Sequence, residues 1–260
     1  MNEDTGSNLE CGGTHRAMSA IGWHDVECGG YRADLPLWRE LAAQEAGPVL
    51  DVGAGAGRVA LDLARAGHDV TALDLDADLL AELRARAERE GLSVRTEQAD
   101  AAGFELSGPL FGLILVPMQT IQLLPGRAAR SAFLASAREH LAAGGLVALA
   151  VAEELEPFEA DIAGGWGSIP PDTGERDGWR YRSFPVAIRR QSDRVVLERV
   201  RVLTAPDGTT SSEDDAIALT NLTADDLEAE GRAAGLRPEA PHAIDETDAH
   251  MGSTVVMLRG

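Results

Sequence analysis

The stretch VLDVGAGAGRVA, residues 49–60, decides the fold of this chain. It begins as an apolar strand, continues as a loop with glycine at every second position, and ends as a helix with apolar residues at helical spacing. Because glycine has no Cβ, the backbone of such a loop can adopt positive φ and lie directly against a ligand. The stretch therefore predicts a strand–loop–helix unit that binds a nucleotide-like cofactor.

Two cofactor classes compete for this loop. Gly55, Gly57 and Ala60 satisfy the dinucleotide pattern G-x-G-x-x-G/A, which would make the chain an NAD-dependent oxidoreductase. Asp51 at the end of the strand disfavours that reading, because its carboxylate would repel a pyrophosphate across a cleft of low dielectric. S-adenosylmethionine carries no phosphate, and its amino and sulfonium groups are cationic. We therefore expect S-adenosylmethionine rather than NAD at this loop.

The pattern D-x-G-x-G-x-G resembles the first motif of the class I S-adenosylmethionine-dependent methyltransferases. The resemblance is specific over residues 48–152 and only topological from residue 153 onward. It implies S-adenosyl-L-methionine as the cofactor, and it implies cofactor contacts for Asp51, Gly53, Ala54, Gly55 and Gly57.

The next landmark is an apolar strand over residues 70–74 that ends in an acid, Asp74. A carboxylate at the tip of a second parallel strand can accept bonds from both hydroxyls of a ribose. The resemblance implies this role for Asp74, with Leu75 beside it in the cofactor site. Asp76 can cap the helix that follows, and a short third strand is expected over 93–95.

Two further stretches extend the predicted site. The resemblance implies that Asp100 and Ala101 address the adenine ring. A fourth strand over 111–116 is almost wholly apolar, as expected of a strand covered on both faces, and in the family its end lies beside the sulfonium. Pro117 is therefore expected at the cofactor and Gln119 at the acceptor. The Asn/Asp-Pro-Pro-aromatic tetrapeptide of amino-methylating nucleic-acid enzymes is missing here, so the cofactor is better defined than the acceptor.

The order of elements predicts an α/β fold. An amphipathic helix over about 35–45 precedes five strands with intervening helices, which require a parallel, doubly wound, Rossmann-like sheet. Two final strands, about 239–244 and 253–258, add an antiparallel hairpin and complete seven strands. After the fifth strand, residues 146–151, period-two alternation and the Asp207-Gly208 turn predict an antiparallel β insertion.

The same order of predicted elements and turns divides the chain into four parts. We expect residues 1–33 to form a flexible N-terminus and lid, residues 34–152 the cofactor-binding core, residues 153–220 the β insertion or cap, and residues 221–260 the helix and strands that complete the core. Neither the entry segment 23–31 nor the segment 164–179 has the unbroken periodicity of a rigid core element. Both are expected to order when the cofactor binds.

The chain is strongly acidic, and this narrows its partners. It has a formal net charge of −20, and all of its basic residues are arginine. A nucleic-acid modifier would need a basic surface, and a peripheral membrane enzyme a basic amphipathic face, so neither partner is expected. The absence of lysine excludes a P-loop and a lysine Schiff base. Cys11 and Cys28 do not have the spacing of metal ligands, so no metal is expected. The residues at the N-terminus do not follow the order of a signal peptide, which predicts a cytoplasmic protein.

Methyl transfer demands little from side chains, because an in-line nucleophile at a dry sulfonium supplies much of the acceleration. A base is needed only where the acceptor must lose a proton. His24 and Tyr31 are the candidate catalytic residues, although each is also a plausible packing residue. Gln119, Trp179 and Tyr181 are the candidates for acceptor contacts, the last two having the alternative of forming the core of the insertion.

The favoured function is transfer of a methyl group to O or N of a small-molecule metabolite by in-line displacement. One alternative keeps the same cofactor fold for a non-methylating reaction or for binding without turnover. An NAD-dependent oxidoreductase is the weaker alternative. Nothing in the residues identifies the acceptor or the oligomeric state.

Overall fold

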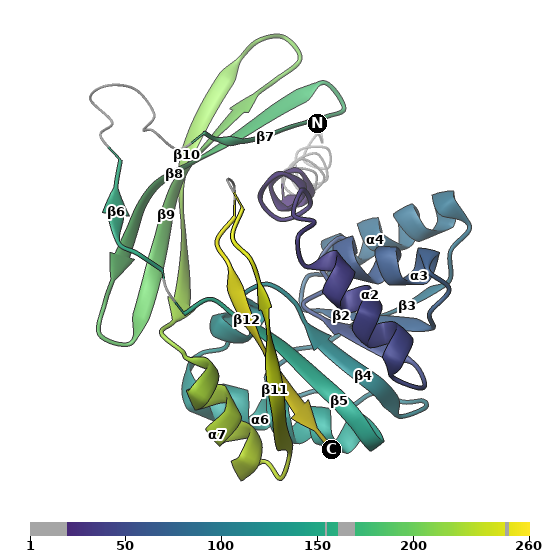
Figure 1. Cartoon of the computed structure of the whole chain (residues 1–260). Coiled ribbons are helices and arrows are strands. Elements are labelled where there is room, and N and C mark those ends of the chain that lie inside the picture. Colours follow the sequence, from purple (N-terminus) through teal and green to yellow (C-terminus); the bar gives the residue numbers. More distant parts are fainter. Residues whose placement is uncertain (1–19, 154, 161–169, 248–249) are drawn as a thin grey trace, which may run out of the picture.

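The computed structural model describes residues 20–153, 155–160, 170–247 and 250–260. A seven-stranded sheet with helices on both faces is joined to a second, antiparallel sheet that stands beside it (Figure 1). Most of the predicted flexible N-terminus, and the first part of the segment 164–179, lie outside the described residues.

The centre of the large sheet is the strand of the glycine stretch. β1 (Val49–Val52) pairs in parallel with β2 (Val70–Asp74) on one side and β4 (Phe111–Val116) on the other. β3 (Val94–Gln98) and β5 (Leu141–Val151) extend the parallel set outward. The strand order is β11-β12-β5-β4-β1-β2-β3. From β1 the chain adds β2 and β3 on one side, and then crosses over to add β4 and β5 on the other side. Open α/β sheets bind ligands in the crevice at such a reversal, which lies here between β1 and β4.

The C-terminal hairpin completes this sheet as the sequence predicts. β12 (Ser253–Arg259) runs antiparallel to β5, and β11 (Arg237–Ile244) runs antiparallel to β12 at the edge. The predicted mostly parallel, seven-stranded, doubly wound sheet is therefore confirmed.

Two strands differ from their predicted lengths. β3 continues through Thr96, Glu97 and Gln98, which the sequence placed after the strand, because an edge strand tolerates polar residues on its solvent side. β5 begins at Leu141, directly after the helix, instead of at Leu146. Its pairing with β4 shifts between Phe111 and Leu113, so that residues 142–145 form an irregularity within the strand rather than a separate loop.

Alternate residues of β4 face two separate cores. Leu113 and Leu115 pack with α2, α3 and α4 on one face, whereas Ile114 and Val116 pack with α6 and α7 on the other. All six residues of β4 are buried, as predicted for a strand covered on both faces. The helices are α2 (Leu35–Gln44), α3 (Arg58–Arg65), α4 (Ala77–Glu90), α5 (Thr120–Leu123), α6 (Gly126–His140) and α7 (Ala224–Ala233).

Local signals fix the starts of two helices. The Asp76 carboxylate accepts hydrogen bonds from the amides of Asp78 and Leu79 at the start of α4. Thr223 and Asp226 form a reciprocal capping box at the start of α7. The cap at Asp76 was predicted from the sequence and is confirmed. None of the described helices is both long and apolar enough to cross a membrane.

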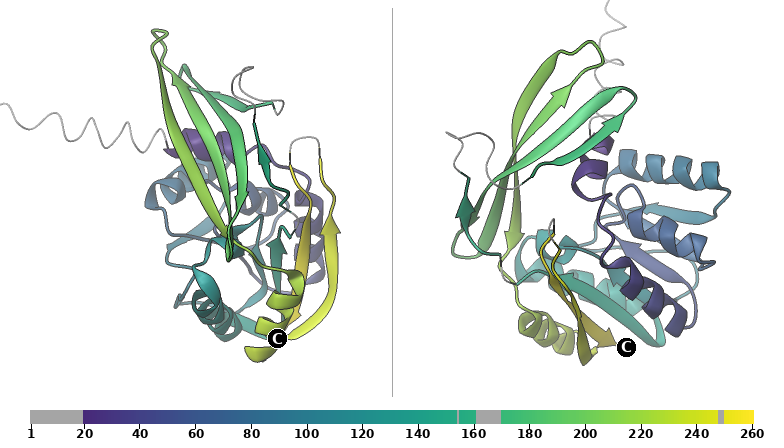
Figure 2. Two further views of the ribbon diagram at one scale, coloured as in Figure 1. Left: turned by 90° about the vertical axis from the view of Figure 1, so that its left-hand side faces the viewer. Right: turned by 45° about the horizontal axis from the view of Figure 1, so that its top comes forward.

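The second sheet is the predicted antiparallel insertion, and its three long strands have 11 or 12 residues each. The strand order is β10-β9-β8-β6, and β7 also pairs with β8. Gly208, with φ of +88°, forms the predicted hairpin turn between β9 and β10. Figure 2 shows that the long strands lean away from the large sheet at one end. The strands are β6 (Phe158–Glu159), β7 (Asp172–Arg176), β8 (Trp179–Arg190), β9 (Arg194–Thr204) and β10 (Thr210–Thr220).

The entry segment is more ordered than its sequence pattern indicated. Residues 20–27 are helical and lie between β7 and α4 (Figure 1). Trp23 is 4% exposed and packs edge-on against Tyr181 of β8, with ring centroids 4.9 Å apart. Asp25 forms ion pairs with Arg86 of α4 at 2.6 Å and with Arg176 of β7 at 3.3 Å. Tertiary contacts from the second sheet and from α4 hold this helix, which is why its short periodic pattern did not reveal it.

Candidate functional site

A cavity of about 530 Å³ lies between the carboxyl edge of the parallel strands and the second sheet. Loops that follow β1, β2, β3 and β4 form one side, and β9 and β10 form the other. The helical residues His24 and Glu27, together with Cys28, close it from the N-terminal side. The predicted cofactor residues that line this cavity are Asp51, Gly53, Ala54, Asp74, Leu75, Asp100, Ala101 and Pro117.

The glycine loop meets this cavity in a backbone shape that other residues rarely adopt. Gly53 and Gly55 have φ of +72° and +54°. A Cβ on Gly53 would overlap Thr120, and a Cβ on Gly55 would overlap the ring of His24. Gly57, with φ of +93°, has a different role, because its Cβ would lie 2.7 Å from Cγ of Leu83. Its absence of a side chain lets α3 pack against α4.

Asp51 is the most unusual group in the cavity wall. It is 1% exposed, and neither of its carboxylate oxygens has a hydrogen-bond partner of ordinary geometry among the described residues. Burial raises the pKa of Asp51 to about 7, although Arg58 and the backbone of Ala60 act in the opposite direction. A buried carboxylate without a partner is costly, so the group is suited to a cationic or donor-rich ligand.

Two further acids lie along the same edge. One oxygen of Asp74 accepts a hydrogen bond from the Gly55 amide at 2.7 Å, and the other accepts from the Asp76 amide at 2.9 Å. Asp74 therefore also shapes the glycine loop, a role that the sequence did not indicate. Asp100 accepts from the Ala102 amide at 2.8 Å and thereby orders the loop after β3.

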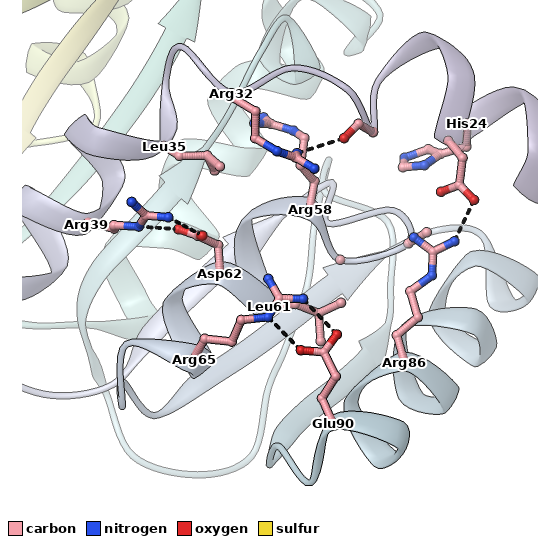
Figure 3. Close-up of a pocket in the computed structure, with 14 residues that line it drawn as sticks. His24, Arg32, Leu35, Arg39, Arg58, Leu61, Asp62, Arg65, Arg86 and Glu90 are labelled. Atoms are coloured by element: carbon pink, nitrogen blue, oxygen red, sulfur yellow. Dashed lines mark hydrogen bonds and ion pairs between the residues drawn. The ribbon is translucent and has the colours of Figure 1, made fainter. Parts of the chain in front are cut away.

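His24 lies directly against Gly55. It lines both this cavity and a second one, which Figure 3 shows. Burial lowers the pKa of His24, outweighing the nearby carboxylates of Asp25 and Asp74. Its Nδ1 atom is buried without a hydrogen-bond partner among the described residues. Burial therefore favours the neutral form of the imidazole at the edge of the predicted cofactor site.

Tyr31, the other candidate catalytic residue, is 6% exposed and is outside the set of residues that line the cavity. Its ring stacks on His250, with centroids 4.7 Å apart, and the guanidinium of Arg58 lies 5.2 Å from its centroid. This position favours the packing role for Tyr31 that the sequence left open.

Sequence reasoning missed the buried ion pair that supports the loop from behind. Both terminal nitrogens of Arg58 bond the carboxylate of Asp34, at 2.5 and 2.7 Å, and both side chains are nearly inaccessible. Asp34 also accepts a hydrogen bond from Trp38 Nε1 at 2.8 Å. Arg58 lines the main cavity and the second one, of about 410 Å³, where Figure 3 shows the pairs Arg39–Asp62 and Arg65–Glu90. The D-x-G-x-G-x-G pattern gives no signal for this arginine.

The far half of the cavity has mainly aliphatic walls. It starts where β4 ends, at Met118, a non-glycine residue with φ of +54°. Backbone strain of this kind is stored at functional sites more often than elsewhere. The predicted acceptor residue Gln119 lines this half. The other lining residues there are Leu123, Leu124, Pro125, Leu197, Ile217 and Leu219, with the polar groups Glu27, Cys28 and Arg199.

Trp179 and Tyr181 were predicted as acceptor residues, and the structure places them elsewhere. Neither belongs to the described lining of the main cavity. Tyr181 is 3% exposed, packs against Trp23, and would overlap a Cβ on Gly22. This position favours the alternative, in which Tyr181 packs between the insertion and the entry helix. The alternating pattern of β8 did not show which face of the sheet meets the cavity.

Sequence comparison relates the central part of the chain to known proteins. Residues 49–145 match a family model described as a methyltransferase domain. An uncharacterized protein of Mycobacterium tuberculosis is 35% identical over 106 residues, and the match covers 39% of this chain. The chain spans 38% of the length of that curated relative.

Solved structures resemble the whole chain. DesVI of Streptomyces venezuelae has a TM-score of 0.65 at 22% identity, covering 98% of this chain and 99% of its own. An amino pentose methyltransferase of Micromonospora echinaspora, solved with S-adenosylmethionine, has a TM-score of 0.65 at 23% identity and full coverage of both chains. A sugar N-methyltransferase of Streptoalloteichus has a TM-score of 0.65 at 22% identity, covering 100% of this chain and 96% of its own.

Residues 49–145 are thus similar in sequence to methyltransferase domains. At these identities the solved structures show the fold alone, a Rossmann-like α/β fold that they share with this chain. The resemblance drawn from the glycine loop is confirmed.

Proposed function

We propose that this chain is an S-adenosylmethionine-dependent methyltransferase that acts on a small molecule. The observation that carries the proposal is the buried, unpartnered carboxylate of Asp51 in the wall of the cavity, beside the glycine loop. A cationic amino group would satisfy both of its oxygens. A pyrophosphate would meet Asp51 and Asp74 together, which argues against the NAD alternative.

The remaining cofactor residues fit the same ligand. Asp74 has lone pairs left for ribose hydroxyls after accepting one amide bond on each oxygen. We propose that Asp100 and Ala101 address the adenine ring, and that Leu75, which is 67% exposed at the cavity mouth, covers it. The positive φ of Gly53 and Gly55 lets the methionine part lie against the backbone.

The bound cofactor would supply an electrophilic methyl group, and the protein's task is to position a nucleophile and exclude water. The aliphatic residues of β9, β10 and α5 that line the cavity serve to exclude water. We propose His24 as the base for an acceptor that must lose a proton, because its neutral imidazole lines the cavity. A His24→Asn variant that binds S-adenosylhomocysteine normally but has a reduced kcat supports this role, and one with an unchanged kcat removes it.

Nitrogen is the first acceptor atom to test, with oxygen second. Several of the structural neighbours are named as N-methyltransferases of sugars or glycopeptides. A small-molecule acceptor also agrees with the charge of −20, since a phosphate backbone would be repelled by such a surface.

Calorimetry with S-adenosylmethionine, S-adenosylhomocysteine and NAD tests the cofactor directly. We expect micromolar or tighter binding of the first two, and no binding of NAD at the same concentrations. Tight binding of NAD alone would replace the proposal with the oxidoreductase. Binding of S-adenosylmethionine without transfer to any amine or hydroxyl acceptor would favour the alternative of cofactor binding without methylation.

A further inference from the structure

The acceptor half of the cavity contains a buried ionic cluster that joins the entry helix to the second sheet. Glu27, whose side chain is 5% exposed, lies at its centre. Arg201 of β9 bonds both Glu27 oxygens, at 2.8 and 2.7 Å, and the hydroxyl of Ser183 donates to one of them at 2.8 Å. These partners, together with the charge of Arg199, lower the pKa of Glu27 despite its burial. The hydrogen bonds to Glu27 come from Arg201 and Ser183.

Arg199 lies two residues away on the same strand and forms ion pairs without hydrogen bonds of ordinary geometry among the described residues. Its Nη1 atom is 2.9 Å from Glu27, and its Nε is 4.0 Å from Asp215. Asp215 has a closer partner in Arg201, at 2.9 Å. Arg201 thus contacts both acids and supplies the arginine hydrogen bonds to Glu27, whereas the N–H groups of Arg199 make no hydrogen bond of ordinary geometry among the described residues.

Arg199, and not Arg201, belongs to the lining of the cavity. The side chain of Arg199 is 17% exposed, and its neighbours in the lining include Leu197 and Ile217. The other basic residue of the lining, Arg58, is committed to Asp34 through both terminal nitrogens. Among the described lining residues, Arg199 is therefore the cation with donors to spare, and it lies in a mostly aliphatic environment where an ionic contact is little screened.

We propose that Arg199 recognises a carboxylate on the methyl acceptor, whose apolar part packs against the aliphatic walls of β9 and β10. The inference rests on the proposed function and adds a substrate class to it, an acceptor with an apolar body and an anionic end. A planar guanidinium matches a carboxylate bidentately, and desolvation strengthens such a pair. The cavity then has an acidic end, with Asp51, Asp74 and Asp100, for the cationic cofactor, and a basic contact for the acceptor.

Binding of simple probes to the protein saturated with S-adenosylhomocysteine tests this assignment. The probes are hexanoate, hexanamide and hexyl phosphate, which share one alkyl chain and differ in the end group. We expect hexanoate to bind at least tenfold more tightly than hexanamide, and more tightly than hexyl phosphate. Equal binding of hexanoate and hexanamide overturns the proposal, and a preference for hexyl phosphate replaces the carboxylate with a phosphate.

The matched variants are Arg199→Gln and Arg190→Gln, the second on an exposed position of the same sheet. Arg199→Gln should abolish the preference for hexanoate and leave S-adenosylhomocysteine affinity and the Tm nearly unchanged, because Glu27 keeps Arg201 and Ser183. Arg190→Gln should behave as the wild type. An Arg199→Gln protein that retains the preference contradicts the proposal. Failure of S-adenosylhomocysteine to bind the wild type would instead refute the proposed function.

Discussion

At the scale of single residues, Asp51 links the stability of the protein to its ligand. Its pKa is about 7 in the folded chain and near 3.8 when exposed. The folded state therefore retains a proton that the unfolded state loses, and the contribution of Asp51 to stability declines as the pH rises from about 4 to about 7. Above that range the ligand-free protein carries the full cost of a buried charge.

We predict that Asp51→Asn removes this decline. Relative to the wild type, the free energy of unfolding of the variant should rise by on the order of 2 kcal/mol from pH 5 to pH 8. Urea denaturation at both pH values measures the difference, with Asp69→Asn at an exposed position as the control. If the free energies of unfolding of Asp51→Asn and the wild type differ by the same amount at pH 5 and at pH 8, Asp51 does not have a raised pKa.

Asp74 supports both the loop and the proposed ribose contact. Removing its carboxylate leaves the amides of Gly55 and Asp76 without their acceptor and removes the acceptor for the ribose. Asp74→Ala should therefore weaken S-adenosylhomocysteine binding by at least tenfold, or about 1.4 kcal/mol. Calorimetry measures this loss, and Asp78→Ala at the exposed first turn of α4 should bind normally. Unchanged affinity in Asp74→Ala contradicts the assignment of this acid to the cofactor.

At the scale of elements, four charged side chains fasten the entry helix to its neighbours. Arg176 of β7 bonds Glu82 of α4 at 3.0 Å, and Arg86 bonds Glu82 at 2.8 Å and Asp25 at 2.6 Å. His24 of the same helix lies against Gly55 and lines the cavity, so a movement of this helix would change the cofactor end of the cavity. We propose that residues 20–33 act as a closing element held by this network.

Hydrogen exchange tests this role. Exchange in residues 20–31 should slow when S-adenosylhomocysteine is added, while β4 stays protected throughout. Arg176→Gln should speed exchange of residues 20–31 in the ligand-free protein, whereas Arg190→Gln should not. Equal exchange of residues 20–31 with and without the ligand would show that the helix is a fixed part of the structure.

The elements also show which parts of the site a sequence can predict. The glycine loop, the acids after β2 and β3, and the apolar β4 are local patterns, and the structure places them together because the carboxyl ends of parallel strands share one edge. Glu27 and Arg199 are far apart in the chain and meet only through packing of the second sheet. Tyr181 shows a second limit of the sequence pattern, since a strand pattern indicates alternation without showing which face of the sheet is turned to the cavity.

At the scale of the whole molecule, the cavity has two halves of different origin. The large sheet supplies the proposed cofactor half, and the second sheet and entry helix supply most of the acceptor half. A family resemblance confined to residues 49–145 therefore covers most of the cofactor half and leaves the acceptor half to features of this chain.

A crystal structure of the protein with S-adenosylhomocysteine tests the central claim most directly. The account predicts that the ligand's amino group lies within hydrogen-bond distance of Asp51, that its ribose hydroxyls bond Asp74, and that its sulfur faces the cavity half lined by Gln119 and Arg199. A ligand bound outside this cavity, or one whose amino group leaves both Asp51 oxygens unpartnered, would contradict the account.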